Sequence, residues 1–275
     1  MKKVLKFGSP VLTVILFALA GILLFGSSIG GANAALTYFS ETYSSRVEMF
    51  DIGVTLNENG TGVSWRNYKA NSNAEWNEHT GVLLENRWSD TDPFQIGKTY
   101  DEVISATNSG TINEYVRVNL YTYWVKVEVD EEGNKQETKL QTRDPSLIDL
   151  HFDENYVGED KYWLLDEKAS TPERKVLYYN RVLEAGKTTV PLTDTLTIDS
   201  TIAVKVTQTE TEIPDGKRIT TTYDYDGVEF RIEAEVDAVQ THNAEDAIWS
   251  AWGRRVSISG GVDDDDVNNV LRLVD

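Results

Sequence analysis

The chain has 275 residues, a formal net charge of −19 at pH 7 and no cysteine. A negative charge of this size repels nucleic acid and anionic lipid, so we expect neither as a partner. The absence of cysteine excludes a disulfide scaffold and a cysteine-linked lipid anchor, so stability must come from a hydrophobic core.

The first 34 residues are typical of a cleavable export signal. Basic residues precede an apolar run at 11–25, which is shorter than the roughly 20 residues that span a bilayer. A small-residue A-x-A motif follows, so we expect membrane contact during export only. The motif and the first residue after the cut are Ala32, Ala34 and Ala35. An uncleaved anchor and a prepilin-type cut after Gly8 are the alternatives.

The segment 35–46, "ALTYFSETYSSR", follows the cleavage motif without Gly or Pro. It is half apolar and is predicted to be extended. It is either a segment that pairs outside its own domain, or an edge strand or loose start of the same domain. Residues 47–56 are predicted to be the first strand of a single domain that runs to residue 275.

Alternation of apolar and polar residues predicts about ten antiparallel strands. The clearest lies at 228–240, where Asp237 and its acidic neighbours fall on the face expected in water. A second spans 114–129, and a shift of its apolar phase predicts a bulge or bend near Trp124. The remaining predicted strands are 47–57, 102–107, 162–166, 175–183, 195–199, 255–259 and the hairpin around the turn at 213–218.

Residues 57–92 are polar and carry Trp65, Trp76 and Trp88, so they are predicted to be a long insertion. Helices are few. One is predicted after Asn243 as N-cap, and a shorter one after Asp144, and both are expected to cover an open end of the fold. The predicted class is all-β, an antiparallel sandwich or jelly roll.

No catalytic motif is present. The three histidines, His79, His151 and His242, do not form the H-E-x-x-H zinc motif, and nucleophile and phosphate-binding motifs are also missing. We therefore expect no enzyme activity and no cofactor. A run of aspartates could bind a hard cation such as calcium, but it lacks the spacing of the known calcium loop and is better interpreted as a solvated loop. These residues are Asp263, Asp264, Asp265 and Asp266.

Several phrases together resemble the TasA and camelysin family of exported proteins. They are "LTYFSETYSSRVEMFDIGVTLNE", "GKTYDEVISATNSGTINEYVRVNLY", "YYNRVLEAGKTTVPLTDTLTI" and "EAEVDAVQTHNAEDAIWSAWG". The resemblance implies a jelly-roll sandwich with short covering helices, cleavage by a dedicated ER-like signal peptidase, and secretion. It also implies fibres of a biofilm matrix, built by donor-strand exchange between copies, with other matrix proteins as further candidate partners.

In that scheme the donor is the segment 35–46, with Leu36 and Tyr38 as its main anchors. An open sheet edge in the neighbouring copy would receive it. The residues expected to start polymerisation are Ala35, Leu36, Thr37, Tyr38, Phe39 and Ser40. Some family members are classed as metallopeptidases, a role that the missing zinc motif does not support here. A secreted metallopeptidase and a monomeric carbohydrate-binding domain are the alternatives.

Overall fold

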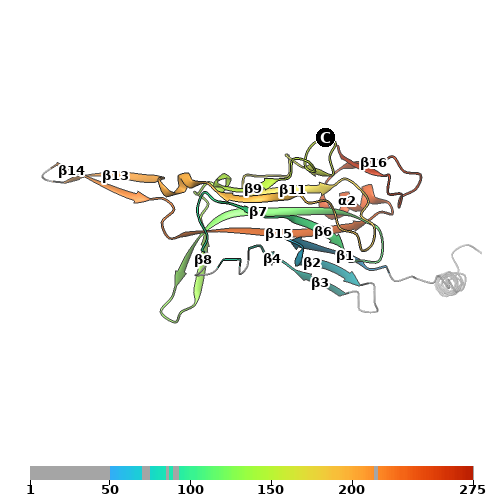
Figure 1. The fold of residues 1–275 in the computed structure, drawn as a ribbon, viewed down its shortest axis with the longest axis horizontal. Helices are drawn as coiled ribbons and strands as arrows, with labels where there is room; N and C mark the ends of the chain where they lie inside the picture. The colour runs from blue at the N-terminus through green and yellow to red at the C-terminus, as the bar shows by residue number, and fades with distance from the viewer. Residues whose placement is uncertain (1–49, 70–74, 85–86, 89–92, 214–215, 275) are drawn as a thin grey trace, which may run out of the picture. The chain divides into compact units, whose positions relative to one another are not determined.

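A computed structural model describes residues 50–69, 75–84, 87–88, 93–213 and 216–274 (Figure 1). The described residues form antiparallel sheets, which confirms the predicted all-β sandwich. The export signal, the cleavage motif and the segment 35–46 lie outside the described residues.

The first layer joins two sheets side by side. The four-stranded sheet has the order β3-β2-β1-β6, and the three-stranded sheet has the order β5-β12-β9. Its strands are β1 (Ile52–Glu58), β2 (Thr61–Lys69), β3 (Glu75–His79), β5 (Thr99–Asp101), β6 (Ile104–Asn108), β9 (Ile148–Phe152) and β12 (Thr193–Ile198). The two sheets connect because residues 187–192, just ahead of β12, bond to the free edge of β6.

Threonine hydroxyls make part of this connection. The backbone N–H groups of Ile104 and Ala106 donate to the hydroxyls of Thr193 and Thr189, each over 3.0 Å. The Thr193 hydroxyl donates in turn to the carbonyl of Glu102 over 2.7 Å. Side chains thus satisfy buried backbone groups where the strands do not pair regularly.

The second layer is a sheet in the order β10-β11-β7-β15-β4, and β8 pairs with the far half of β7. Its strands are β4 (Gly81–Val82), β7 (Glu114–Val129), β8 (Lys135–Lys139), β10 (Trp163–Leu165), β11 (Arg174–Tyr179) and β15 (Val228–Gln240). β7 and β15 are paired without interruption from Glu114 opposite Gln240 to Lys126 opposite Val228.

The main core lies between the two layers. Leu56 of β1 and Ile104 of β6 belong to the same buried cluster as Val118 of β7 and Ile232 of β15. Every second residue of these strands faces inward, as the period of a strand requires. Removing such side chains from water is the main favourable term in folding the sandwich.

A second core covers the outer face of the second layer. It is formed under the helix α2 (Ala244–Trp252) and the strands β16 (Val256–Ser259) and β17 (Val270–Leu273). Ile248 of α2 and Leu271 of β17 share this cluster with Tyr115 of β7. The helix therefore covers a sheet face, and not an open end of the sandwich as expected.

The predicted ends of the helices are confirmed in part. Asp144 caps the 3-10 turn η1 (Pro145–Leu147) and accepts a bond from the Ser146 N–H over 3.0 Å. Gly253 ends α2 with a φ of 65°, in the left-handed region that glycine tolerates. Asn243 is the N-cap residue of α2, as predicted, but its side chain makes no capping bond to the helix backbone: its amide donates to Asp246, and its φ of 51° is left-handed.

Of the bulge or bend predicted near Trp124, the bulge is contradicted, since the pairing of β7 with β15 has no register shift there. The apolar phase changes for another reason. Both faces of the first half of β7 are covered, with Val116 in the main core and Tyr115 in the second core. Farther along the strand both cores end, and Val129 is 62% exposed.

Residues 57–92, which are predicted to be a long insertion, contribute strands to the sandwich. They supply all of β2, β3 and β4. Only glycine fits at position 81 of β4, because a Cβ atom there would lie 2.3 Å from the Val63 carbonyl oxygen. Trp65 stacks on His79 with ring centres 4.6 Å apart, and Trp88 packs against the main core.

A two-stranded ribbon lies apart from both layers (Figure 1). It consists of β13 (Val206–Ile213), which follows the 3-10 turn η2 (Ser200–Ala203), and β14 (Gly216–Tyr223). The two strands pair with each other along their whole length, and neither pairs with another strand of the described residues. The hairpin predicted around residues 213–218 is therefore confirmed, although positions 214–215 are outside the described residues.

Candidate functional site

The strand β9 is an edge of the first layer. The Asp199 N–H donates to the Leu147 carbonyl over 2.9 Å, and the Asp153 N–H donates to the Leu192 carbonyl over 3.1 Å. The odd-numbered residues from 147 to 153 therefore direct their backbone groups towards β12. The alternate residues Leu150 and Phe152 therefore direct theirs away from the sheet. No partner for these outward groups is found among the described residues.

A groove of about 1460 Å³ lies beside this edge. It is lined by residues of β9, β10 and β17 and by the adjoining part of β11. The labels of β9 and β11 lie next to each other in Figure 1. Leu150, Phe152 and Leu165 are half-buried and pack against the main core from its rim. The groove thus combines unpaired backbone groups with an incompletely covered apolar lining, the arrangement that accepts an added strand.

The rim of the groove is charged. His151 Nδ1 lies 2.8 Å from the Asp194 carboxylate, and this hydrogen bond raises the pKa of the His151 side chain. Asp149, Glu154 and Asp160 are exposed along the same rim. Lys175, Arg181 and Arg272 also line the groove, so an occupant has to be apolar where it meets the floor and polar where it leaves the groove.

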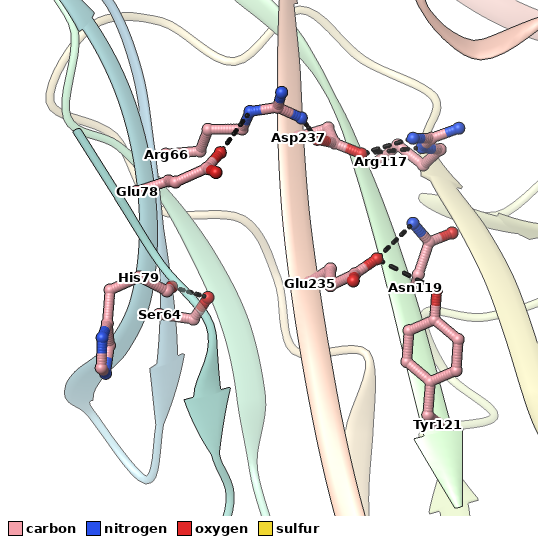
Figure 2. A network of polar contacts seen from close by, with 9 residues as sticks. All are labelled: Ser64, Arg66, Glu78, His79, Arg117, Asn119, Tyr121, Glu235 and Asp237. Atoms are coloured by element: carbon pink, nitrogen blue, oxygen red, sulfur yellow. Dashed lines mark hydrogen bonds and ion pairs between the residues drawn. The ribbon is translucent and has the colours of Figure 1, made fainter. Parts of the chain in front are cut away.

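The opposite side of the sandwich is closed by a polar network (Figure 2). Asp237 of β15 accepts bonds from Arg66 of β2 and from Arg117 of β7, and Glu78 of β3 pairs with Arg66 over 3.4 Å. Only 9% of the Asp237 side chain is exposed, and 18% of the Arg117 side chain. Since β2 and β15 belong to different layers, these contacts join the layers at the edge remote from the groove.

The other polar contacts in Figure 2 each lie within a single sheet. Glu235 accepts a bond from the Tyr121 hydroxyl over 3.0 Å on the outer face of the second layer. The Ser64 hydroxyl donates to the His79 carbonyl over 2.7 Å between β2 and β3. Neither contact leaves a reactive group free, so we assign this region a structural role.

Two acidic side chains are buried inside the sandwich. Burial raises the pKa of Glu114 to about 9. Burial and the adjacent Glu58 carboxyl raise the pKa of Glu102 to about 8, although the positive charge of Arg87, which contacts the Glu102 carboxyl, acts to lower it. Both side chains are fully covered. They are therefore neutral acids at pH 7.

The aspartate run lies in the loop between β16 and β17, and its members have separate partners. Asp264 accepts a bond from the Asn243 N–H over 3.2 Å, and Asp265 accepts one from the Thr241 hydroxyl. Asp266 accepts bonds from the N–H groups of Val262 and Asn268, and the latter bond lowers its pKa. The loop is thus organised by hydrogen bonds within itself and by bonds to the connection between β15 and α2.

The described residues contain no group of three or more His, Asp or Glu side chains that could hold a metal ion. His79, His151 and His242 are not brought together: they stack on Trp65, pair with Asp194 and pair with Asp264, respectively. Within the same residues, no helix is long and apolar enough to cross a membrane.

Comparison with models of protein families, with curated proteins and with solved structures found no match. Placement in the TasA and camelysin family is therefore a proposal that rests on the quoted phrases. The residues expected to start polymerisation, Ala35 to Ser40, lie outside the described part of the chain. The receiving groove could not be located from sequence, because it depends on which strand lies at the edge of its sheet.

Proposed function

We propose that the exported chain is the structural subunit of an extracellular fibre, in which residues 35–46 of one copy pair with β9 of the next. The observation that carries this proposal is the open edge of β9 above an apolar groove. The partners are further copies of this chain and the signal peptidase that releases residue 35, and other matrix proteins could join the fibre. The site of action is the cell surface or extracellular matrix.

The edge offers an added strand two kinds of contact. The backbone groups of Leu150 and Phe152 point outward and supply a hydrogen-bond ladder. Their side chains, with Leu165, supply apolar contact. Backbone bonds give such complexes affinity, and alternate side chains in pockets give them specificity.

The segment 35–46 fits this edge in length and pattern. As an extended strand it would cover roughly 40 Å, well over the ~17 Å of a five-residue strand such as β9. Leu36 and Tyr38 are two residues apart, so both would face the same side of a strand. Arg46 would bring a charged side chain to a rim that carries both acidic and basic residues. A head-to-tail contact of this kind does not close on itself and produces a filament.

A cysteine cross-link tests the pairing directly, because the natural chain has no cysteine. In the exported protein carrying Tyr38→Cys and Leu150→Cys, oxidation should give a ladder of covalent oligomers on a non-reducing gel. The matched control carries Tyr38→Cys and Gln136→Cys, since Gln136 is exposed on β8 and does not line the groove. It should remain largely uncross-linked.

Two results would contradict the proposal. A disulfide within one chain would mean that the segment fills its own groove. Filaments that still form after deletion of residues 35–40 would remove the donor strand as the polymerising element. Mass spectrometry of the exported N-terminus supplies the remaining check, since cleavage at a position other than residue 35 would redefine the donor.

A further inference from the structure

The outer face of the four-stranded sheet is polar and uncharged. Val54 and Leu56 of β1 face the main core, so Thr55 between them faces outward, together with its cross-strand partners Trp65 and Thr107. The described outward side chains of β1, β2, β3 and β6 are those of serine, threonine, asparagine, histidine and tryptophan. None of these is an acid, a lysine or an arginine, although the chain carries a net charge of −19. Neither hydrophobic core of the described residues covers this face.

Hydrogen bonds between the side chains hold this face in one arrangement. The Asn57 amide donates to the Thr107 hydroxyl over 2.7 Å, and the Thr55 hydroxyl donates to that of Ser109 over 3.3 Å. The Ser109 hydroxyl donates in turn to Asn67 Oδ1 over 2.8 Å. An asparagine amide has two N–H donors and two acceptor lone pairs, so these contacts leave bonding capacity for a ligand. A polar ligand would therefore meet donors and acceptors that are already fixed, which lowers the entropy cost of binding.

One aromatic ring is fixed within this polar face. Trp65 stacks on His79 with ring centres 4.6 Å apart, and its indole N–H donates to Asn77 Oδ1 over 3.1 Å. Figure 2 shows the His79 ring directed away from the Asp237 network that joins the layers. The half-buried Trp65 ring is thus held by two residues of β3 in one orientation.

A hollow of about 760 Å³ borders the face at this ring. Trp65 lines it together with Gly62, which faces the same side as Thr55 and has no side chain to fill the space. Asp101 and Arg87 also line the hollow. A carboxylate repels anions and a guanidinium group repels cations, whereas both form hydrogen bonds with hydroxyl groups. The hollow therefore favours an uncharged ligand that is rich in hydroxyl groups.

We propose that this face binds a neutral polysaccharide, with one sugar ring on Trp65 and neighbouring sugar hydroxyls bonded to Asn67 and Asn77. A sugar ring has an apolar side that packs on an aromatic ring, and its hydroxyls both donate and accept. An anionic polymer would be repelled by the charge of the chain. A protein partner would require a larger apolar centre, and Trp65 is the one large apolar side chain among the described outward residues.

This site is separate from the β9 groove and goes beyond the proposed function. The groove involves the three-stranded sheet, whereas the polysaccharide would lie on the four-stranded sheet. Binding is therefore expected whether or not the chain forms fibres. A fibre that binds no polysaccharide would contradict only this inference, and a monomer that binds one would contradict only the fibre.

The test applies the full exported chain to surfaces coated with hydroxyethylcellulose, dextran or galactomannan and measures binding by interferometry. At least one of these neutral polymers should bind. The carboxymethylated form of the polymer that binds has the same backbone and a negative charge, and it should bind much more weakly.

Single substitutions locate the site. Trp65→Ala should weaken binding about tenfold, whereas Trp65→Phe keeps an aromatic ring and should retain most of it. Trp249→Ala is the matched control, because Trp249 is a 46% exposed tryptophan on α2, and it should leave binding unchanged. Asn67→Asp places a negative charge on the face and should also weaken binding. Gln136→Glu adds the same charge on the exposed strand β8 and should not.

Four results would overturn the proposal. They are no binding of the natural chain to any of the three polymers, equal binding of the carboxymethylated form, equal effects of Trp65→Ala and Trp249→Ala, and equal effects of Asn67→Asp and Gln136→Glu. Melting temperatures show whether each variant is folded. If Trp65→Ala does not fold, the comparison of Asn67→Asp with Gln136→Glu decides.

Discussion

Arg66 of β2 donates a hydrogen bond to Asp237 of β15 and so links the two layers of the sandwich. The sequence pattern places Asp237 on a water-facing side, yet only 9% of its side chain is exposed. Its burial results from arginines on two other strands, each far away in the sequence. This relationship leads to the first prediction.

Asp237→Ala should lower the free energy of unfolding by roughly 3 kcal/mol, because the largely covered Arg117 loses its charged partner. The matched control is Glu78→Ala, which removes an ion pair whose carboxylate is 66% exposed. It should cost less than about 1 kcal/mol. Urea unfolding followed by tryptophan fluorescence measures both values, and equal losses would show that the Asp237 contacts are not special.

Thr193→Val should destabilise the protein by about 1 to 3 kcal/mol, because the buried Ile104 N–H then loses its acceptor. The shape of the side chain is nearly unchanged, so the loss reports the hydroxyl. Thr197→Val is the control, since the Thr197 hydroxyl bonds only to that of Thr99 at an exposed position. The control should change stability by less than about 0.5 kcal/mol. Equal effects in chemical denaturation would contradict the bridging role of Thr193.

The protein should become more stable as the pH falls from 9 towards 5. Glu114 and Glu102 have folded-state pKa values of about 9 and about 8, well above the ordinary glutamate value of 4.5. Below pH 4.5 both states are protonated and neither acid opposes folding. As the pH rises above that value only the unfolded chain ionises, so stability is lost up to the folded pKa, by about 1 to 2 kcal/mol per pH unit for each group.

Glu114→Gln isolates one of these two contributions. The variant should unfold at a higher temperature than the natural chain at pH 8, and its melting temperature should depend less on pH. Near pH 4.5 the two proteins should be about equally stable. A variant that retains the full pH dependence would assign the effect to other groups.

A peptide of residues 35–46 should raise the melting temperature of a chain that begins at residue 47. Binding to the folded state alone stabilises by about 2.7 kcal/mol at a peptide concentration one hundred times the dissociation constant. The control peptide carries Leu36→Glu and Tyr38→Glu and should have no effect. A natural peptide without effect would argue against the β9 groove as its receptor.

Local alternation predicted much of the fold. The strand β15 is found at 228–240 and β7 at 114–129, as predicted, because each has a long run of strand-forming residues with turn residues nearby. The helix after Asn243 and its end at Gly253 also follow from local signals. These features depend on residues close together in the chain.

Other features depend on pairing between distant segments. β9 is an edge only because β12 is its sole strand partner among the described residues, and no local signal marks it as one. The sequence pattern does not predict β2 and β3, because apolar and polar residues do not alternate clearly there. The false bulge near Trp124 arose because one strand serves two cores, which a single-face pattern cannot represent.

The two buried acids, Glu114 and Glu102, also link unfolding of the chain to the release of protons. Both have raised pKa values in the sandwich and ionise at pH 7 once they reach water, so unfolding at that pH releases protons from them. The heat absorbed on unfolding must therefore include the heat of protonating the buffer. Calorimetric enthalpies measured at the same pH should differ between phosphate and Tris, in the direction set by the two buffers' ionisation enthalpies.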